Sequence, residues 1–136
     1  MTDVILRDVT LRDGLQDERP VPTDTKLAVF EALVAAGIQE LELTSFVRPD
    51  RVPAMADAEA LCAATAGAPV RRWGLVLNER GAARALGAGL RDLQFVVSVS
   101  DTHSRHNAGR STDEALAALA DVSQLAAEVG ATVEVT

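Results

Sequence analysis

Apolar and polar positions follow two spacings along the chain, and the two spacings alternate in a regular order. Short, almost uniformly apolar runs predict strands buried on both faces, as in a parallel sheet. Stretches with an apolar residue every three or four positions lie between these runs and predict helices. The expected order is β-α-β-α-β-α-β-α-β. The expected strands are Val4 to Thr10, Glu40 to Thr44, Val70 to Leu77, Asp92 to Val99 and Thr132 to Thr136.

Four helices are predicted between these strands, with recognisable start and stop residues. Thr23 is a good N-cap for the first helix, and Gly37 stops it. Ser111 or Thr112 caps the last helix, which has Glu114 in its first turn and runs up to Gly130. Ala54 to Ala66 and Glu79 to Leu86 are the two helices in between, and Ser100 to Arg110 is expected to be a long polar loop.

This alternation predicts an α/β fold, the N-terminal part of a (β/α)8 TIM barrel, as a single partial domain over residues 1–136. No Gly-x-Gly-x-x-Gly motif follows the first strand and no Walker-type lysine loop is present, which disfavours dinucleotide and nucleoside triphosphate sites. A complete barrel needs eight strands and roughly 250 residues. The sequence therefore predicts about five strands of such a barrel.

The second strand is expected to place two glutamates inside the barrel. Side chains alternate along a strand, so Leu41 and Leu43 share one face while Glu40, Glu42 and Thr44 share the other. We expect the leucine face to meet the helices and the other face to point inward. A carboxylate inside a barrel needs a partner. For Glu42, an ion pair with Arg7 or Arg12 and a role in an active site are both open, and the two are compatible.

Polar side chains gather in the loops that follow the predicted strands. Ligands collect at the carboxyl ends of parallel strands, so these loops predict one functional face. Asp13 could supply an oxygen to Mg²⁺ or Mn²⁺, and Arg12 could stabilise an enolate or carboxylate, although a salt bridge within the turn is the alternative. The polar residues of this face are Arg12, Asp13, Gln16, Ser45, Asn78, Asp101, His103, His106 and Asn107.

The other candidate groups are expected to have plainer roles. His103 and His106 lie in a predicted loop, so substrate contact or simple solvation is favoured over a metal pair. Cys62, within an apolar helix, predicts core packing, because no activating base lies nearby in sequence. As a single cysteine it cannot form a disulfide framework, which indicates a reducing cytoplasm.

The net charge of −7 argues against general nucleic-acid binding. The acidic N-terminus lacks the basic and apolar regions of a signal peptide, and no stretch is apolar enough for a membrane span. We therefore expect a cytoplasmic protein.

Several spaced blocks closely resemble the 3-hydroxy-3-methylglutaryl-CoA (HMG-CoA) lyase family. They are Arg12 to Glu18, Val21-Pro22-Thr23 with Lys26, Ala36-Gly37, Glu42 to Pro49 and Val52 to Asp57, with a looser similarity through Asn78, Gly81 and the Ser100 to Asn107 loop. Leu11 is closer to the wider superfamily that includes isopropylmalate and homocitrate synthases.

The resemblance implies a TIM barrel that uses a divalent metal, Mg²⁺ or Mn²⁺, to cleave an acyl-CoA substrate by a retro-Claisen reaction. Acetyl-CoA and acetoacetate are the products in the family. By position, Asp13 matches the metal ligand, Arg12 the residue that stabilises the enolate-like product, and Glu42 the buried carboxylate that organises the site. Further substrate-binding positions are expected at Gln16, Ser45, Asn78 and His103.

The family's other metal ligands, two histidines and an asparagine, and its catalytic cysteine loop come from later strands that these residues do not include. One carboxylate holds an octahedral ion poorly, and an unclosed parallel sheet leaves an apolar edge open. We therefore expect this chain to be inactive alone, and either to associate, as in a homo-oligomer, or to depend on further sequence. The alternatives are a Claisen-type synthase and a non-catalytic half-barrel that serves as an assembly module.

Overall fold

The computed structural model describes residues 4–136 and contains one sheet of five parallel strands in the order β1-β2-β3-β4-β5. Each strand pairs with the next one in sequence, which is the neighbour order of a βα-barrel wall. The strands are β1 (Arg7–Asp8), β2 (Glu40–Ser45), β3 (Arg71–Val76), β4 (Asp92–Phe95) and β5 (Thr132–Val135).

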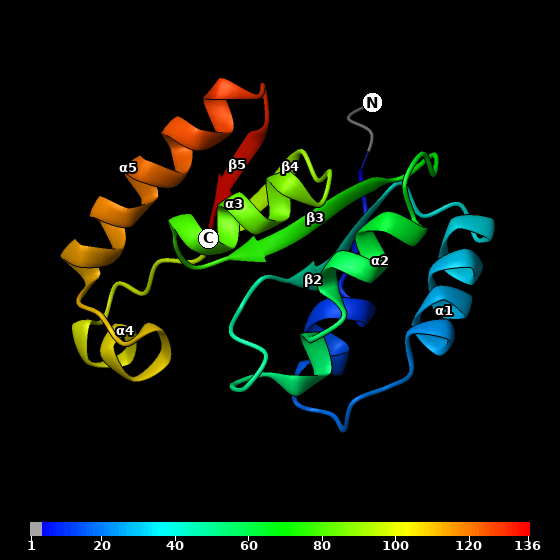
Figure 1. Ribbon diagram of the computed structural model, residues 1–136, viewed down its shortest axis with the longest axis horizontal. Coiled ribbons are helices and arrows are strands. Elements are labelled where there is room, and N and C mark those ends of the chain that lie inside the picture. The colour runs from blue at the N-terminus through cyan, green and yellow to red at the C-terminus, as the bar shows by residue number, and fades with distance from the viewer. Residues whose placement is uncertain (1–3) are drawn as a thin grey trace.

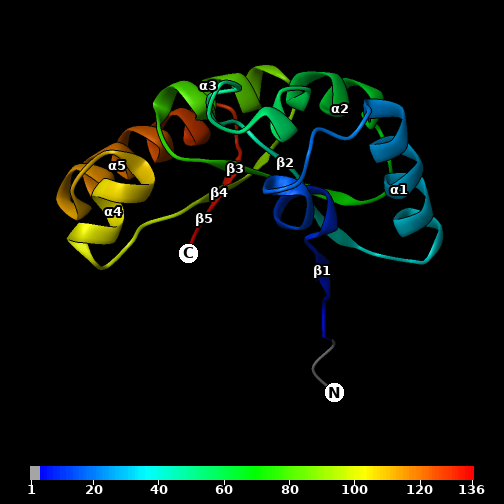
Figure 2. The ribbon, with the colours of Figure 1, turned by 90° about the horizontal axis from the view of Figure 1, so that it is seen from below.

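The α-helices lie on one side of this sheet and form an arc over it (Figures 1 and 2). The helical elements are η1 (Thr10–Gly14, a π-helical turn), α1 (Thr23–Ala35), η2 (Pro53–Met55, a 3₁₀ turn), α2 (Ala58–Ala64), α3 (Glu79–Gly87), α4 (Asp101–Ala108) and α5 (Thr112–Glu128). No helix within residues 4–136 is long and apolar enough to cross a membrane. The parallel sheet with helices on one side is the expected partial TIM barrel, and its inner face is open (Figure 2).

The hydrophobic core lies between the sheet and the helices. Leu41, Leu43, Val76 and Leu93 are fully buried there, as the uniformly apolar strands predict. Packing is so close at Gly74 that a Cβ atom would lie 2.6 Å from Leu90 Cδ1. Cys62 belongs to the same core, and its burial raises the pKa of the thiol to about 11, so the prediction of a packing role is confirmed.

The inner face of the sheet carries an ionic cluster. Arg7 donates to Glu40 at 3.1 Å and to Glu134 at 2.6 Å, which joins β1, β2 and β5. Arg7 and Arg71 also lie over the Trp73 ring, at 3.9 and 4.5 Å from its centroid. Burial alone would raise the pKa of Glu40, but hydrogen bonds from Trp73, Arg7 and Arg71 outweigh it and hold that pKa below its ordinary value.

The first strand is shorter than the predicted run from Val4 to Thr10. Only Arg7 and Asp8 pair with β2, and Val4, Ile5 and Leu6 are exposed. The Asp8 carboxylate accepts from the Thr10 backbone N–H at 2.9 Å, which turns the chain into η1. A local side-chain bond of this kind competes with the strand ladder.

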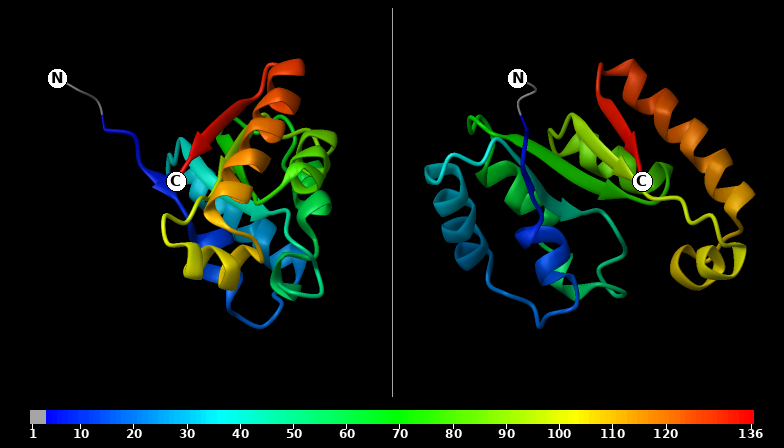
Figure 3. Two further views of the ribbon diagram at one scale, coloured as in Figure 1. Left: turned by 90° about the vertical axis from the view of Figure 1, so that its left-hand side faces the viewer. Right: turned by 180° about the vertical axis from the view of Figure 1, so that it is seen from behind.

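The prediction of a loop from Ser100 to Arg110 was wrong, because this segment contains helix α4 (Figure 3). The side chain of Ser100 accepts from the His103 N–H at the start of α4, and Gly109 ends it with a φ of 71°. β4 ends at Phe95 instead of continuing to Val99, which is fully exposed.

Two helix predictions also need correction. Pro22, not Thr23, precedes α1, and the Thr23 hydroxyl donates to Asp57 at 2.8 Å instead of capping the helix. The single helix expected over 54–66 divides into η2 and α2. At α5, in contrast, Ser111 and Glu114 form the predicted capping box.

The alternation in β2 holds only as far as Leu43. The register with β3 shifts between Glu42 and Thr44, and this irregularity reverses the faces of the residues that follow. Thr44 therefore lies on the helix side, where its hydroxyl contacts Met55 Sδ at 3.7 Å. The prediction that Thr44 points inward was wrong, and Ser45 takes the inward position in its place.

Candidate active site

Arg12 and Glu42 form the central ion pair of the candidate site. The turn of η1 carries Arg12 back over the middle of β2, where its Nε donates to Glu42 Oε2 at 2.6 Å and its Nη2 contacts the same oxygen. The Glu42 side chain is 5% exposed and that of Arg12 is 13% exposed. The buried carboxylate thus fixes a guanidinium at the carboxyl end of the sheet. Of the two possible ion-pair partners of Glu42, Arg7 and Arg12, the structure shows Arg12.

Asp13 lies beside this pair but faces solvent. Its Oδ1 accepts from Arg12 Nη1 at 2.8 Å, and its side chain is 63% exposed. The salt bridge within the turn, which the sequence analysis gave as the alternative to metal binding, is therefore present. One carboxylate oxygen remains open toward solvent on this side of the turn.

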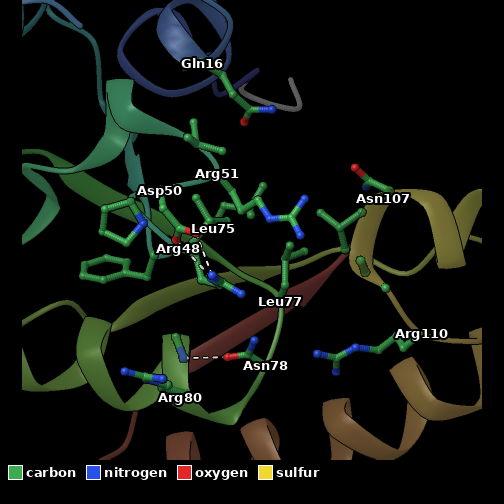
Figure 4. Close-up of a pocket in the computed structure, with 18 of the residues that line it drawn as sticks. Gln16, Arg48, Asp50, Arg51, Leu75, Leu77, Asn78, Arg80, Asn107 and Arg110 are labelled. Carbon is green, nitrogen blue, oxygen red and sulfur yellow. Dashed lines mark hydrogen bonds and ion pairs between the residues drawn. The ribbon is translucent and has the colours of Figure 1, made fainter.

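A cavity of about 1220 Å³ opens next to Arg12, between the loops that follow β2 and β3 and helix α4 (Figure 4). Its floor includes Leu75 on β3, and its walls come from η1, the segment from Phe46 to Val52, the start of α3 and the residues from Arg105 to Arg110. Loops that follow four successive strands thus enclose one space, as expected for the carboxyl face of a barrel.

Two of the predicted substrate-binding residues, Gln16 and Asn78, line this cavity together with Arg12. Asn78 also caps α3, because its Oδ1 accepts from the Gly81 N–H at 2.8 Å (Figure 4). Gly81 lies so close to the loop that an added Cβ would be 2.8 Å from the Phe46 carbonyl oxygen. The start of α3 and the loop after β2 are therefore fitted to each other.

Ser45 and His103 are not among the residues that line the cavity. Ser45 is 1% exposed, and its Oγ has no hydrogen-bond partner within residues 4–136. It pairs with Leu75 across the sheet, so it lies beside the cavity floor. His103 is exposed on α4, whereas His106 and Asn107, one turn further along, reach the cavity.

The family model described as HMGL-like matches residues 3–136. The chain belongs to the HMGL-like family. Among curated relatives, the (R)-citramalyl-CoA lyase of Chloroflexus aurantiacus is 38% identical over 128 residues, which cover 85% of this chain and 40% of that protein.

Solved HMG-CoA lyases share the fold. The Bacillus subtilis HMG-CoA lyase superposes with a TM-score of 0.91 at 33% identity, covering 97% of this chain and 45% of that one. An HMG-CoA lyase from Acinetobacter baumannii in complex with coenzyme A and 3-methylmalate gives 0.90 at 30% identity, over 99% of this chain and 46% of that one. This HMGL-like chain spans less than half the length of these proteins, which confirms that it corresponds to part of their barrel.

Residues 4–136 of this HMGL-like chain do not by themselves assemble a metal site. No group of three or more His, Cys, Asp or Glu side chains within residues 4–136 is placed to hold an ion. Glu42 is occupied by Arg12, so Asp13 is the one open carboxylate at this turn. A divalent ion needs about six oxygen ligands, and the donors present do not supply them.

Sequence reasoning missed several residues of this HMGL-like site. Besides Arg12, six arginines line the cavity, and no local pattern marks them, because loops distant in sequence bring them together. It also gave no role to buried Lys26, whose Nζ donates to the Ala54 carbonyl and to Asp57, both at 2.6 Å. This contact fixes α1 to the end of the loop that follows β2, Phe46 to Val52, which we call the cavity loop. An isolated lysine on an otherwise apolar helix face was the available signal.

Proposed function

We propose that this chain forms the Arg12 side of the active site of a carbon–carbon lyase that cleaves a 3-hydroxyacyl-CoA by a retro-Claisen reaction. The observation that carries the proposal is the Arg12–Glu42 pair beside a large cavity at the carboxyl face of the sheet. Membership of the HMGL-like family and relatives named as acyl-CoA lyases support it.

The chemistry assigns Arg12 a specific task. In the proposed reaction the bond between C2 and C3 of the acyl group breaks, and its electron pair moves onto the thioester to form an enolate. The 3-hydroxyl loses its proton to become a ketone, and the enolate is then protonated at C2. A guanidinium fixed in advance near the thioester oxygen stabilises the enolate charge as it develops.

Glu42 would act on the reaction through Arg12. A single arginine with a long side chain samples many rotamers, and holding it in one of them lowers the cost of placing charge at the reacting oxygen. Two contacts from Arg12 to the same Glu42 oxygen provide that restraint. Gln16 and Asn78 would contact the substrate from the cavity wall, with Ser45 beside the floor. His103 remains a proposed substrate contact because it follows the fourth strand, although it does not line the cavity.

We propose Mg²⁺ or Mn²⁺ as the cofactor, with Asp13 as one ligand. The exposed oxygen of Asp13 supports this assignment, and the other ligands would have to come from residues beyond those described here. When bound, such an ion would polarise oxygen atoms of the substrate. The Asp13→Asn substitution in the complete gene product should weaken Mn²⁺ binding, measured by electron paramagnetic resonance.

Two acyl groups are candidates. One curated relative is named as a citramalyl-CoA lyase and several as HMG-CoA lyases. The two thioesters share a methyl group and a hydroxyl on C3 and differ by one methylene before the carboxylate. A pocket distinguishes one methylene by only about 10–200-fold, so both substrates must be compared. HMG-CoA is our first candidate.

The test is an assay of the complete gene product for acetyl-CoA formation from HMG-CoA and from (R)-citramalyl-CoA, with Mg²⁺, with Mn²⁺ and with chelator. Metal-dependent acetyl-CoA release from either thioester supports a lyase. Condensation of acetyl-CoA with a 2-oxo acid, without cleavage of either thioester, would instead show a Claisen-type synthase. Absence of any turnover, both with metal and with chelator, would favour an assembly module.

We further propose a cytoplasmic homo-oligomer. The single cysteine is buried in the core and needs no oxidising compartment. Exposed apolar residues at the outer strands, Val4 to Leu6 on one side and Val135 on the other, support association with further strands. Sedimentation of the purified gene product measures the oligomeric state directly.

A further inference from the structure

The cavity has a charge opposite to that of the chain. The protein has a net charge of −7, yet seven of its thirteen Lys and Arg residues line the cavity, against one of its twenty Asp and Glu residues. The seven are Arg12, Arg48, Arg51, Arg80, Arg84, Arg105 and Arg110, and the single acid is Asp50. An anion is the ligand that such a surface attracts.

Four of the seven guanidinium groups already have carboxylate partners. Arg12 pairs with Glu42 and Asp13, Arg48 with Asp50, Arg84 with Glu59 and Arg105 with Asp101. Arg48 holds Asp50 at 2.6 Å, and its hydrogen bond, together with the nearby charge of Arg51, lowers the pKa of this one acidic residue of the lining.

Three arginines of the lining make no ion pair with any group in residues 4–136. Arg51 lies in the turn after β2, Arg80 in the first turn of α3, and Arg110 between α4 and α5. Arg51 and Arg110 reach toward the cavity from opposite sides (Figure 4). Because three separate segments place these groups around one space, their charges act together on whatever occupies it.

We propose that Arg51, Arg80 and Arg110 bind the phosphate groups of a coenzyme A thioester. This inference rests on the proposed function and deepens it. Arginine pairs with phosphate through two parallel hydrogen bonds, which suits a ligand with several phosphate oxygens. Arg51 and Arg80 are exposed and Arg110 is partly buried, whereas the Arg12 side chain is only 13% exposed. A coenzyme A thioester carries its acyl group at one end and its phosphates at the other, so the acyl end would meet Arg12 and the phosphates would meet the outer arginines.

The experiment compares binding of CoA, 3′-dephospho-CoA and pantetheine by the complete gene product, measured by calorimetry. Arg51→Gln, Arg80→Gln and Arg110→Gln are each expected to weaken CoA binding about tenfold and to leave pantetheine binding unchanged. At least one variant should lose the difference between CoA and its 3′-dephospho form. Arg91→Gln is the matched control, because Arg91 lies at the amino end of β4, away from the cavity.

Absence of CoA binding, wild-type affinity in all three variants, or an equal loss of CoA and pantetheine binding would overturn the proposal. Circular dichroism of each variant verifies the fold. The two proposals can fail separately. CoA binding that depends on the three arginines, without cleavage of any thioester, would support the phosphate site and refute the lyase. Thioester cleavage that is unaffected by the three substitutions would support the lyase and refute the phosphate site.

Discussion

Arg12 in the turn after β1 and Glu42 in the middle of β2 are joined by a hydrogen bond of 2.6 Å, from Nε to Oε2. The pair links residues thirty positions apart and places a positive charge at the edge of the cavity. The charge of Arg12 is thereby aimed before any substrate arrives, so its partner should influence both stability and turnover.

We expect Glu42→Gln to lower the free energy of unfolding and kcat together. Removing one partner of a buried ion pair costs about 3–5 kcal/mol, because the other charge stays buried without compensation. Urea unfolding and steady-state turnover of the complete gene product measure the two effects. The double variant Arg12→Met with Glu42→Gln is the control. Its loss of unfolding free energy should be smaller than the sum of the losses in the two single variants. Additive losses would contradict direct coupling.

The buried Lys26 should stabilise the cavity loop, because it joins α1 to the residues that follow this loop. Lys26→Met keeps the volume of the side chain, but it removes the donor of the Ala54 carbonyl and the positive charge beside Asp57. We expect a loss of about 3–5 kcal/mol in the free energy of unfolding. Thr23→Val is the milder comparison, because it removes only the neutral hydrogen bond to Asp57 and should cost about 1 kcal/mol. Equal losses in the two variants would count against a charged support.

Two glycines of α3 form a matched pair for testing the close contact between this helix and the cavity loop. Gly81→Ala would bring Cβ to 2.8 Å from the Phe46 carbonyl oxygen, whereas no atom lies within 4 Å of a Cβ at Gly87. We expect Gly81→Ala to destabilise the protein by about 1–3 kcal/mol and Gly87→Ala to be neutral or slightly stabilising. Thermal unfolding distinguishes the two, and similar melting temperatures would show that the loop can move aside.

The ionic cluster on the inner face predicts a loss of stability in acid. Hydrogen bonds from Arg7 lower the pKa of Glu134, and those from Trp73, Arg7 and Arg71 lower the pKa of Glu40 against the effect of burial. Both folded-state values lie below the unfolded value of about 4.3. Their stabilisation is therefore complete above the unfolded pKa and disappears as the pH falls through the folded pKa.

The measurement is the free energy of urea unfolding between neutral pH and about pH 3. Replacing Glu40 and Glu134 together by Gln should make the dependence on pH shallower in the acid range. Glu31→Gln is the control, because this exposed glutamate makes no ion pair within the described chain. An unchanged acid slope in the double variant would refute the role of the cluster.

The sequence predicted the parallel barrel wall from the short, almost uniformly apolar runs of its strands. β2 is buried at every position, whereas both ends of β5 are exposed. The prediction failed where local hydrogen bonds override period. Asp8 turned the end of the first strand, Ser100 started an unexpected helix, and the irregularity in β2 moved Thr44 to the other face. Strand ends brought Arg12, Gln16 and Asn78 to one cavity as predicted, whereas Arg51, Arg80 and Arg110 meet only through tertiary structure.

The assignment of Arg12 as the group that stabilises the enolate is the central claim, and kcat of the Arg12→Gln variant tests it most directly. The complete gene product should be assayed on whichever thioester it cleaves, with circular dichroism confirming the fold. We expect kcat to fall by about 10²–10³, as for the loss of a group that stabilises developing negative charge. A folded Arg12→Gln variant that retains the wild-type kcat would contradict the account.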